Sequence, residues 1–252
     1  PPRPGHGMSN EVALAVPVGS LGWWGDRLSR YGSAVGGTET RFGEKALPFA
    51  DPHGLRVALV ESEEPSHRSF TAFGASPVPP ERQIRGLHGA RMLERSLAPT
   101  TSFLEDVMGF RRVGTEGSWH RYALPAGGSG TLLDVAESPN TPRGIWGIGA
   151  IHHLAWRVDD DEHELAVRER IEAAGARPTP VIDRFWFRSV YFKEPGGVLF
   201  ELATDGPGFG VDEETAHLGE KLVLPPWLEP RREQIESALP PLTMPSAAET
   251  SR

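Results

Sequence analysis

The feature that most constrains the fold is a segment that occurs twice. Residues 49–60 (FADPHGLRVALV) match residues 192–203 (FKEPGGVLFELA) without a gap. Each pattern predicts a strand, a turn containing an acidic residue, proline and glycine, and a second strand with alternating apolar residues. Gly54 and Gly197 stand where such a turn needs a positive φ. The sequence therefore predicts the same β-hairpin at two places, which indicates a repeated unit.

A short strand and an amphipathic helix precede each hairpin. In the first case the strand covers 12–17 and the helix ends at Gly32. In the second the strand covers 153–158 and the helix runs from an N-cap at Asp160 to Gly175. The residues expected on the buried helix faces are Leu21, Trp24, Leu28 and Tyr31 in the first copy and Val167, Ile171 and Ala174 in the second.

A third copy lies between these two. It has a predicted strand at 90–93, a helix at 101–108 that ends at Gly109, and strands near 119–124 and 130–135. The sequence thus predicts an α+β fold of three repeated β-α-β-β-β modules whose strands form curved mixed sheets.

The modules divide the chain into five predicted parts. These are a module at 1–62, a linker at 63–84 rich in Pro, Ser and Glu, modules at 85–147 and 148–205, and a Pro-rich tail at 206–252 with a helical stretch at 230–239. Curved modules of this kind bury their concave faces in pairs, so three copies leave one unpaired. Because the chain opens at Pro1 and enters the first module almost at once, we expect a fourth module upstream or from another chain.

Composition excludes several classes of function. Lys and Arg number 26 against 34 Asp and Glu, so the formal charge of −8 offers no basic field for a nucleic acid. The chain has no cysteine, so a bound metal must be held by His and carboxylate groups. Because no apolar run is long enough for a membrane span and the N-terminus lacks signal-peptide character, we expect a soluble, cytoplasmic protein.

Three side chains of the third module indicate a metal site. His152 and His153 open a predicted strand, and alternation predicts their rings on opposite faces, with His153 on the face of Ala155. Glu201 interrupts an apolar strand of the same module, where the first module has Ala58. A buried glutamate is costly unless it is paired or bound to metal, although a glutamate on an alternating strand can also face solvent. Together with His153, Glu201 favours metal ligation.

The other modules offer weaker ligands. In the middle module Gly89 stands at the position of His153. In the first module the same position is Glu11 or Val12, depending on the alignment, and Glu11 is more typical of an exposed acid at a strand end. Two histidines and one carboxylate with open coordination positions bind non-haem Fe(II) together with substrate and O₂. The chain supplies two of these three ligands.

Several stretches together resemble a known family. They are 84–89 (IRGLHG), 151–155 (IHHLA), 183–192 (DRFWFRSVYF), 200–209 (FELATDGPGF), 218–222 (LGEKL) and 224–226 (LPP). The chain resembles the vicinal oxygen chelate superfamily of glyoxalases, bleomycin-resistance proteins and extradiol dioxygenases. The resemblance is closest to the ring-cleaving branch that includes hydroquinone and chlorohydroquinone 1,2-dioxygenases, and it covers residues 12 to about 242.

The resemblance implies an Fe(II)-dependent extradiol-type dioxygenase that opens a hydroquinone- or catechol-like ring with O₂ as co-substrate. It implies His153 and Glu201 as metal ligands, and these donors also accept Mn(II). It places His152, Arg184 and Tyr191 around a small aromatic substrate, where they would handle the proton of the substrate hydroxyl and stabilise developing negative charge. In the family the other histidine comes from a further N-terminal module, so we expect it from outside this sequence.

Two other functions remain open. A glyoxalase-type, metal-dependent lyase would belong to the same superfamily, but the motif at 183–192 and the tail argue against it. A non-catalytic binder of aromatic ligands, such as a resistance protein, is favoured by the incomplete ligand set. Self-association into a homo-oligomer is a reasonable hypothesis, because one module would expose its concave face.

Overall fold

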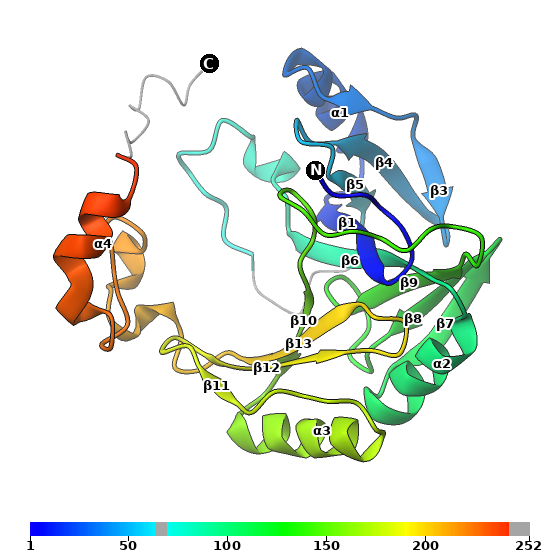
Figure 1. The fold of residues 1–252 in the computed structure, drawn as a ribbon. Helices are drawn as coiled ribbons and strands as arrows, with labels where there is room; N and C mark the ends of the chain where they lie inside the picture. The colour runs from blue at the N-terminus through cyan, green and yellow to red at the C-terminus, as the bar shows by residue number, and fades with distance from the viewer. Residues whose placement is uncertain (64–69, 242–252) are drawn as a thin grey trace.

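A computed structural model of the chain describes residues 1–63 and 70–241. These residues form a nine-stranded sheet and a four-stranded sheet (Figure 1). The strands of the larger sheet are β1 (Met8–Val16), β2 (Ala34–Val35), β3 (Glu39–Arg41), β4 (Glu44–Ala50), β5 (Arg56–Glu61), β6 (Gly86–Glu94), β7 (Arg111–Glu116), β8 (Trp119–Ala123) and β9 (Leu132–Glu137). The strands of the smaller sheet are β10 (Leu154–Val158), β11 (Ile182–Asp183), β12 (Arg188–Lys193) and β13 (Leu199–Thr204).

The strand order repeats three times. The larger sheet runs β2-β4-β5-β1-β6-β9-β8-β7, with β3 paired to β4. Antiparallel pairing of β1 with β6 joins the first and second modules, and on each side the next strand is parallel to the central one. The smaller sheet runs β10-β13-β12-β11, which is the order β6-β9-β8-β7 again. The predicted α+β fold of β-α-β-β-β units is confirmed.

The hairpin that repeats in the sequence also repeats in the structure. Residues 49–60 lie in β4 and β5, residues 192–203 lie in β12 and β13, and both strand pairs are antiparallel. The turn glycines have the expected backbone, with a φ of 90° at Gly54 and 105° at Gly197. The expected fourth module concerns residues outside this sequence.

The helices differ in detail from the prediction. Helix α1 (Leu21–Arg30) buries Leu21 and Trp24, but Tyr31 follows the helix and is 63% exposed. In the middle module the helix begins earlier than predicted, as α2 (Leu97–Ser102), and continues as a π-helical turn (Phe103–Val107).

The third-module helix follows its predicted boundaries. The side chain of Asp160 accepts a hydrogen bond from the backbone N–H of His163, at 2.8 Å, and so caps α3 (Asp161–Ala173). Val167 and Ile171 are buried against the sheet as expected, whereas Ala174 lies after the helix and is exposed.

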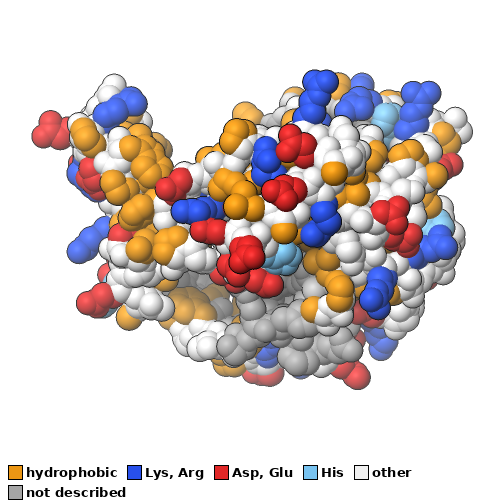
Figure 2. All heavy atoms as spheres, turned by 90° about the horizontal axis from the view of Figure 1, so that it is seen from below, with side chains coloured by type: hydrophobic (Ala, Val, Ile, Leu, Met, Phe, Trp, Pro, Cys, Tyr) orange, Lys and Arg blue, Asp and Glu red, His pale blue; other side chains and the backbone are white. Residues whose placement is uncertain are grey.

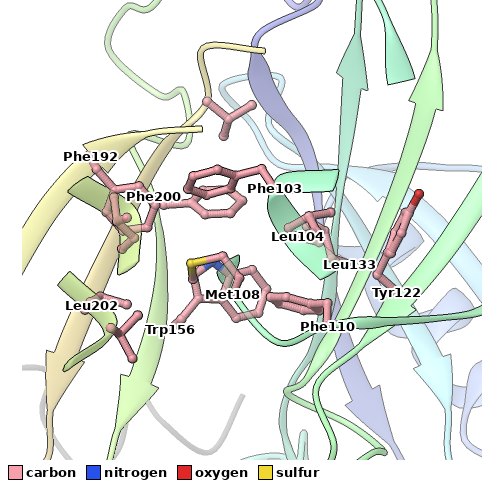
Figure 3. Packing of buried hydrophobic residues seen from close by; sticks show 14 of the residues in the cluster. Phe103, Leu104, Met108, Phe110, Tyr122, Leu133, Trp156, Phe192, Phe200 and Leu202 are labelled. Atoms are coloured by element: carbon pink, nitrogen blue, oxygen red, sulfur yellow. The ribbon is translucent and has the colours of Figure 1, made fainter. Parts of the chain in front are cut away.

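The largest core cluster joins the second and third modules (Figure 3). Phe103 from the π-helical turn lies against Phe192 of β12, with ring centroids 6.0 Å apart. Phe110 meets Trp156 of β10 edge to face, at 4.9 Å between centroids. Phe200 and Leu202 of β13 point into the same cluster. Since side chains alternate along a strand, Glu201 between them faces the opposite side of the sheet.

The described residues of the linker and of the tail contain little regular structure. Within the predicted linker the described residues include a 3₁₀ turn at Pro80–Arg82, and residues 64–69 lie outside the described part. The described part of the tail contains a short helix, α4 (Arg232–Ala238), inside the predicted stretch 230–239. On the face shown in Figure 2, basic and acidic side chains are interspersed. None of the helices in the described residues has both the length and the apolarity that a membrane span requires.

Candidate metal centre

The candidate site lies on the face of the smaller sheet that points away from α3. Glu201 of β13 stands at the middle of this face, because β13 pairs with β10 on one side and β12 on the other. Its direct neighbours in the register are Ala155 of β10 and Tyr191 of β12. The sheet therefore fixes the relative positions of the predicted carboxylate ligand and the predicted tyrosine.

His153 meets Glu201 at this face. The histidine immediately precedes β10, and its Nε2 lies 2.7 Å from Oε2 of Glu201. The carboxylate is only 3% exposed, whereas the His153 side chain is 33% exposed. The pair is therefore anchored on the buried side by Glu201 and opens toward solvent at His153.

One oxygen of Glu201 fits a metal ligand. Oε1 is buried and has no hydrogen-bond partner, and an ionised carboxylate oxygen left in that state is costly. An imidazole nitrogen and a carboxylate are donors suited to Fe, Mn and Zn ions. Among the residues that the structure describes, no third His, Cys, Asp or Glu completes a metal-binding group. His153 and Glu201 thus fit as two ligands of a metal.

The ring of His152 contacts the ring of His153 and does not lie on the opposite face. Its Nδ1 lies 3.0 Å from Nδ1 of His153, and the two rings meet at 90° with centroids 5.3 Å apart. The prediction of opposite faces was wrong, because β10 begins at Leu154 and both histidines lie before the regular alternation starts. A single proton between the two Nδ1 atoms makes one ring the donor and the other the acceptor.

Tyr191 and Arg184 complete the predicted set. The rings of Tyr191 and His153 meet edge to face at 5.5 Å between centroids. Burial and the neighbouring Glu201 raise the pKa of the Tyr191 phenol. The Arg184 guanidinium lies 5.5 Å from the Tyr191 ring centroid, and its Nε donates to Oγ of Ser189 at 3.3 Å. Contacts with Tyr191 and Ser189 thus hold Arg184 beside the site.

Sequence reasoning missed Trp146. This residue lies in the loop before β10, with its ring 5.3 Å from that of His152, and the ammonium of Lys193 is 5.8 Å from the Trp146 centroid. An aromatic residue between Gly144 and Gly147, a few residues before the histidine pair, was the available signal. Trp146 adds an aromatic wall beside His152.

The register also tests the weaker ligand positions. In the third module His153 lies two residues before Ala155, the residue of β10 that pairs with Glu201. The same count gives Glu11 in the first module and Gly89 in the second. The expected exposure of Glu11 was wrong, because the residue is buried and paired with Arg41 at 2.5 Å.

Comparison with known proteins assigns the family. Residues 87–202 match the model of the glyoxalase/bleomycin resistance protein/dioxygenase superfamily. MhqO of Bacillus subtilis (strain 168), which is named as a ring-cleaving dioxygenase, is 42% identical over 237 residues, covering 94% of this chain and 74% of MhqO. The chain belongs to this superfamily. The predicted resemblance is therefore confirmed.

Other relatives agree. The chlorohydroquinone/hydroquinone 1,2-dioxygenase of Sphingobium indicum is 31% identical over 237 residues, which cover 92% of this chain and 72% of that enzyme. A crystal structure described as a dioxygenase from Bacillus subtilis superposes with a TM-score of 0.88 at 40% identity, over 96% of this chain and 76% of the other. Maize glyoxalase I, at 14% identity and a TM-score of 0.56, shares the fold. The relatives group the chain with oxidoreductases that incorporate oxygen.

Proposed function

We propose that this chain is a ring-cleaving dioxygenase of the extradiol type, which uses Fe(II) and O₂ to open a hydroquinone- or catechol-like ring. The observation that carries the proposal is the buried Glu201 carboxylate, paired with His153 and with one oxygen left without a partner. Similarity to hydroquinone and other ring-cleaving dioxygenases supports the substrate class.

Nε2 of His153 and a carboxylate oxygen of Glu201 would hold the metal. Fe(II) bound there would supply the redox chemistry with O₂ and the Lewis acidity that makes a phenolic hydroxyl easier to deprotonate. The same donors accept Mn(II), so the identity of the ion is part of the proposal. The chain itself contributes the ligand geometry and the groups that bind and orient the substrate.

His152 would fix the protonation state of His153. A histidine that ligates through Nε2 must carry its proton on Nδ1, and Nδ1 of His153 faces Nδ1 of His152 at 3.0 Å. His153 would then donate to His152, which accepts. This hydrogen bond orients the ligating ring and increases its basicity, as outer groups do around other metal sites.

Tyr191 and Arg184 would bind the substrate oxygen. Because the pKa of Tyr191 is raised by burial and by Glu201, its phenol keeps its proton and donates through Oη. The Arg184 guanidinium, on the same side of the sheet as Tyr191, would stabilise negative charge that forms on the substrate oxygen. Trp146 would offer its ring to the aromatic substrate.

A second candidate is a non-catalytic binder of aromatic ligands. It is favoured by the finding that the described residues bring together two metal donors and no third. The two functions differ in their need for metal, because a binder would take up an aromatic ligand equally well without iron.

The test combines Fe(II) binding under anaerobic conditions with O₂ uptake on a panel of hydroquinones and catechols. We expect iron-dependent O₂ uptake that His153→Ala abolishes, together with loss of bound iron. His163→Ala is a matched control on α3, because the His163 side chain is 42% exposed and bonds Asp159 next to the start of the helix. Aromatic binding that survives in His153→Ala, with no O₂ uptake in the unaltered protein, would support the binder and refute the dioxygenase.

A further inference from the structure

The three modules place different residues at the positions of the proposed ligands. In the third module Glu201 lies between Ala155 and Tyr191 in the register. In the second module the same position is Asp134, which lies between Arg91 of β6 and Arg121 of β8. The middle module therefore keeps a carboxylate where the third module has the proposed metal ligand.

The larger sheet brings two such carboxylates together. Glu11 of β1 is at the position of His153, and Asp134 of β9 is at the position of Glu201. The antiparallel β1–β6 pair puts Glu11 directly opposite Arg91, the residue that is also next to Asp134. Both carboxylates are 5% exposed. A pair of ligand positions is thus filled by acids from two modules.

A guanidinium lies between these acids. Nε of Arg91 is 3.3 Å from Oδ2 of Asp134 and 3.9 Å from Oε1 of Glu11, and its guanidinium carbon lies 4.5 Å from the Trp119 ring centroid. Burial and the nearby Arg41 guanidinium lower the pKa of Arg91. Arg91 is therefore a partly buried cation, with a side chain that is 14% exposed, shared by two carboxylates.

Other ion pairs surround these acids, and the backbone closes the other ligand position. Glu11 also pairs with Arg41, and Asp134 with Arg121, whose other partner is Glu44. Counting these with Arg91 and with Glu39, the second partner of Arg41, gives three guanidinium groups and four carboxylates. At the remaining position a side chain on Gly89 would place its Cβ 2.8 Å from the carbonyl oxygen of Leu132. No histidine fits there without a shift of the backbone.

We infer that the Arg91 guanidinium takes the place of a metal ion in the larger sheet, so that Glu11 and Asp134 are a latent pair of cation ligands. The equivalence of positions rests on the proposed ligands His153 and Glu201. The contacts of Glu11 and Asp134 with the arginines do not depend on that proposal. Removing the Arg91 charge leaves two guanidinium groups against four carboxylates, of which Glu39 is exposed, and a divalent cation can then enter.

The test measures Mn²⁺ binding to Arg91→Met in a protein that also carries His153→Ala, so that the proposed iron site cannot contribute. Methionine retains an apolar stem beside Trp119. We expect the His153→Ala protein to bind no Mn²⁺ in the larger sheet, and the double variant to bind about one equivalent and to unfold at a higher temperature when Mn²⁺ is added.

Two further variants complete the test. Adding Asp134→Asn should remove the gained Mn²⁺, whereas adding Asp161→Asn, which changes an exposed partner of Arg188 in the third module, should leave it. A folded Arg91→Met protein that gains no Mn²⁺ would overturn the inference, and so would one that stays unfolded with and without the ion. Gained Mn²⁺ alongside an unaltered protein that binds no iron would refute the proposed function and leave this inference standing.

Discussion

The two sheets differ in the partners that they give to acidic residues at equivalent positions. In the larger sheet the acids Glu11 and Asp134 are each bound by arginines, and the cluster is closed by its own charges. In the smaller sheet the described residues give Glu201 an ion pair with His153 and no arginine partner, and one of its oxygens has no hydrogen-bond partner. At the same position of the repeated fold, an acid thus has a structural role where the sheet supplies its counter-charge. Where the sheet supplies none, the acid is available to bind a metal.

The largest expected effect on stability comes from opening the closed cluster. Glu11→Ala removes a buried partner of Arg41 and should lower the free energy of unfolding by about 3–5 kcal/mol. Glu39→Ala removes the exposed partner of the same arginine and should cost about 0–1 kcal/mol. Urea unfolding of both variants measures the difference. Equal costs for the two would show that the cluster is no more than a set of surface ion pairs.

A second prediction concerns the open site. Tyr191→Phe removes the phenol beside Glu201 and should lower kcat about 10–100-fold, the range seen for groups that support metal ligands. Tyr122→Phe is the control in the larger sheet, where the hydroxyl lies 2.6 Å from Oγ1 of Thr101. It should cost about 1 kcal/mol of stability and leave kcat unchanged. Steady-state O₂ uptake and urea unfolding separate the two effects, and a Tyr191→Phe enzyme with full kcat would remove Tyr191 from the proposed mechanism.

The smallest effect is expected where the second and third modules meet. Glu94 at the end of β6 is fully buried with both oxygens unpartnered, and burial and Glu194 raise its pKa to about 8, against the opposing influence of Arg143. Its folded pKa exceeds its unfolded value of 4.5, so its contribution to stability is fully present below pH 4.5, falls as pH rises, and is lost above about 8.

Glu94→Gln should remove that pH dependence and stabilise the protein by roughly 1–3 kcal/mol at pH 9. Unfolding free energies from pH 5 to about 9 provide the measurement. Glu137→Gln, at the exposed end of the neighbouring strand β9, should leave the pH dependence as it is. A Glu94→Gln profile that still falls as steeply between pH 4.5 and about 8 would assign the effect to another group.

Much of the fold follows from local pattern. The hairpin turns need glycine at Gly54 and Gly197, and the N-cap at Asp160 needs a short acceptor side chain, so the repeat could be found from sequence alone. The early start of α2 could not, because its burial is decided by contact with the third module.

The site was predictable to a similar extent. His153 and Glu201 could be paired because His153 opens one strand and Glu201 interrupts an apolar strand of the same module. The burial of Glu11 depends on Arg41, thirty residues away and on another strand, and no local pattern indicates that contact. The alternation rule also failed for His152, since the regular strand begins only at Leu154.

The most direct test compares Glu201→Gln with Asp134→Asn, two isosteric changes at equivalent positions of the two sheets. Bound iron per chain and the free energy of unfolding are measured for both. We predict that Glu201→Gln loses its iron with little change in stability, and that Asp134→Asn keeps its iron but loses about 3–5 kcal/mol. Iron retained by Glu201→Gln and lost from Asp134→Asn would contradict the assignment of the metal centre to the smaller sheet.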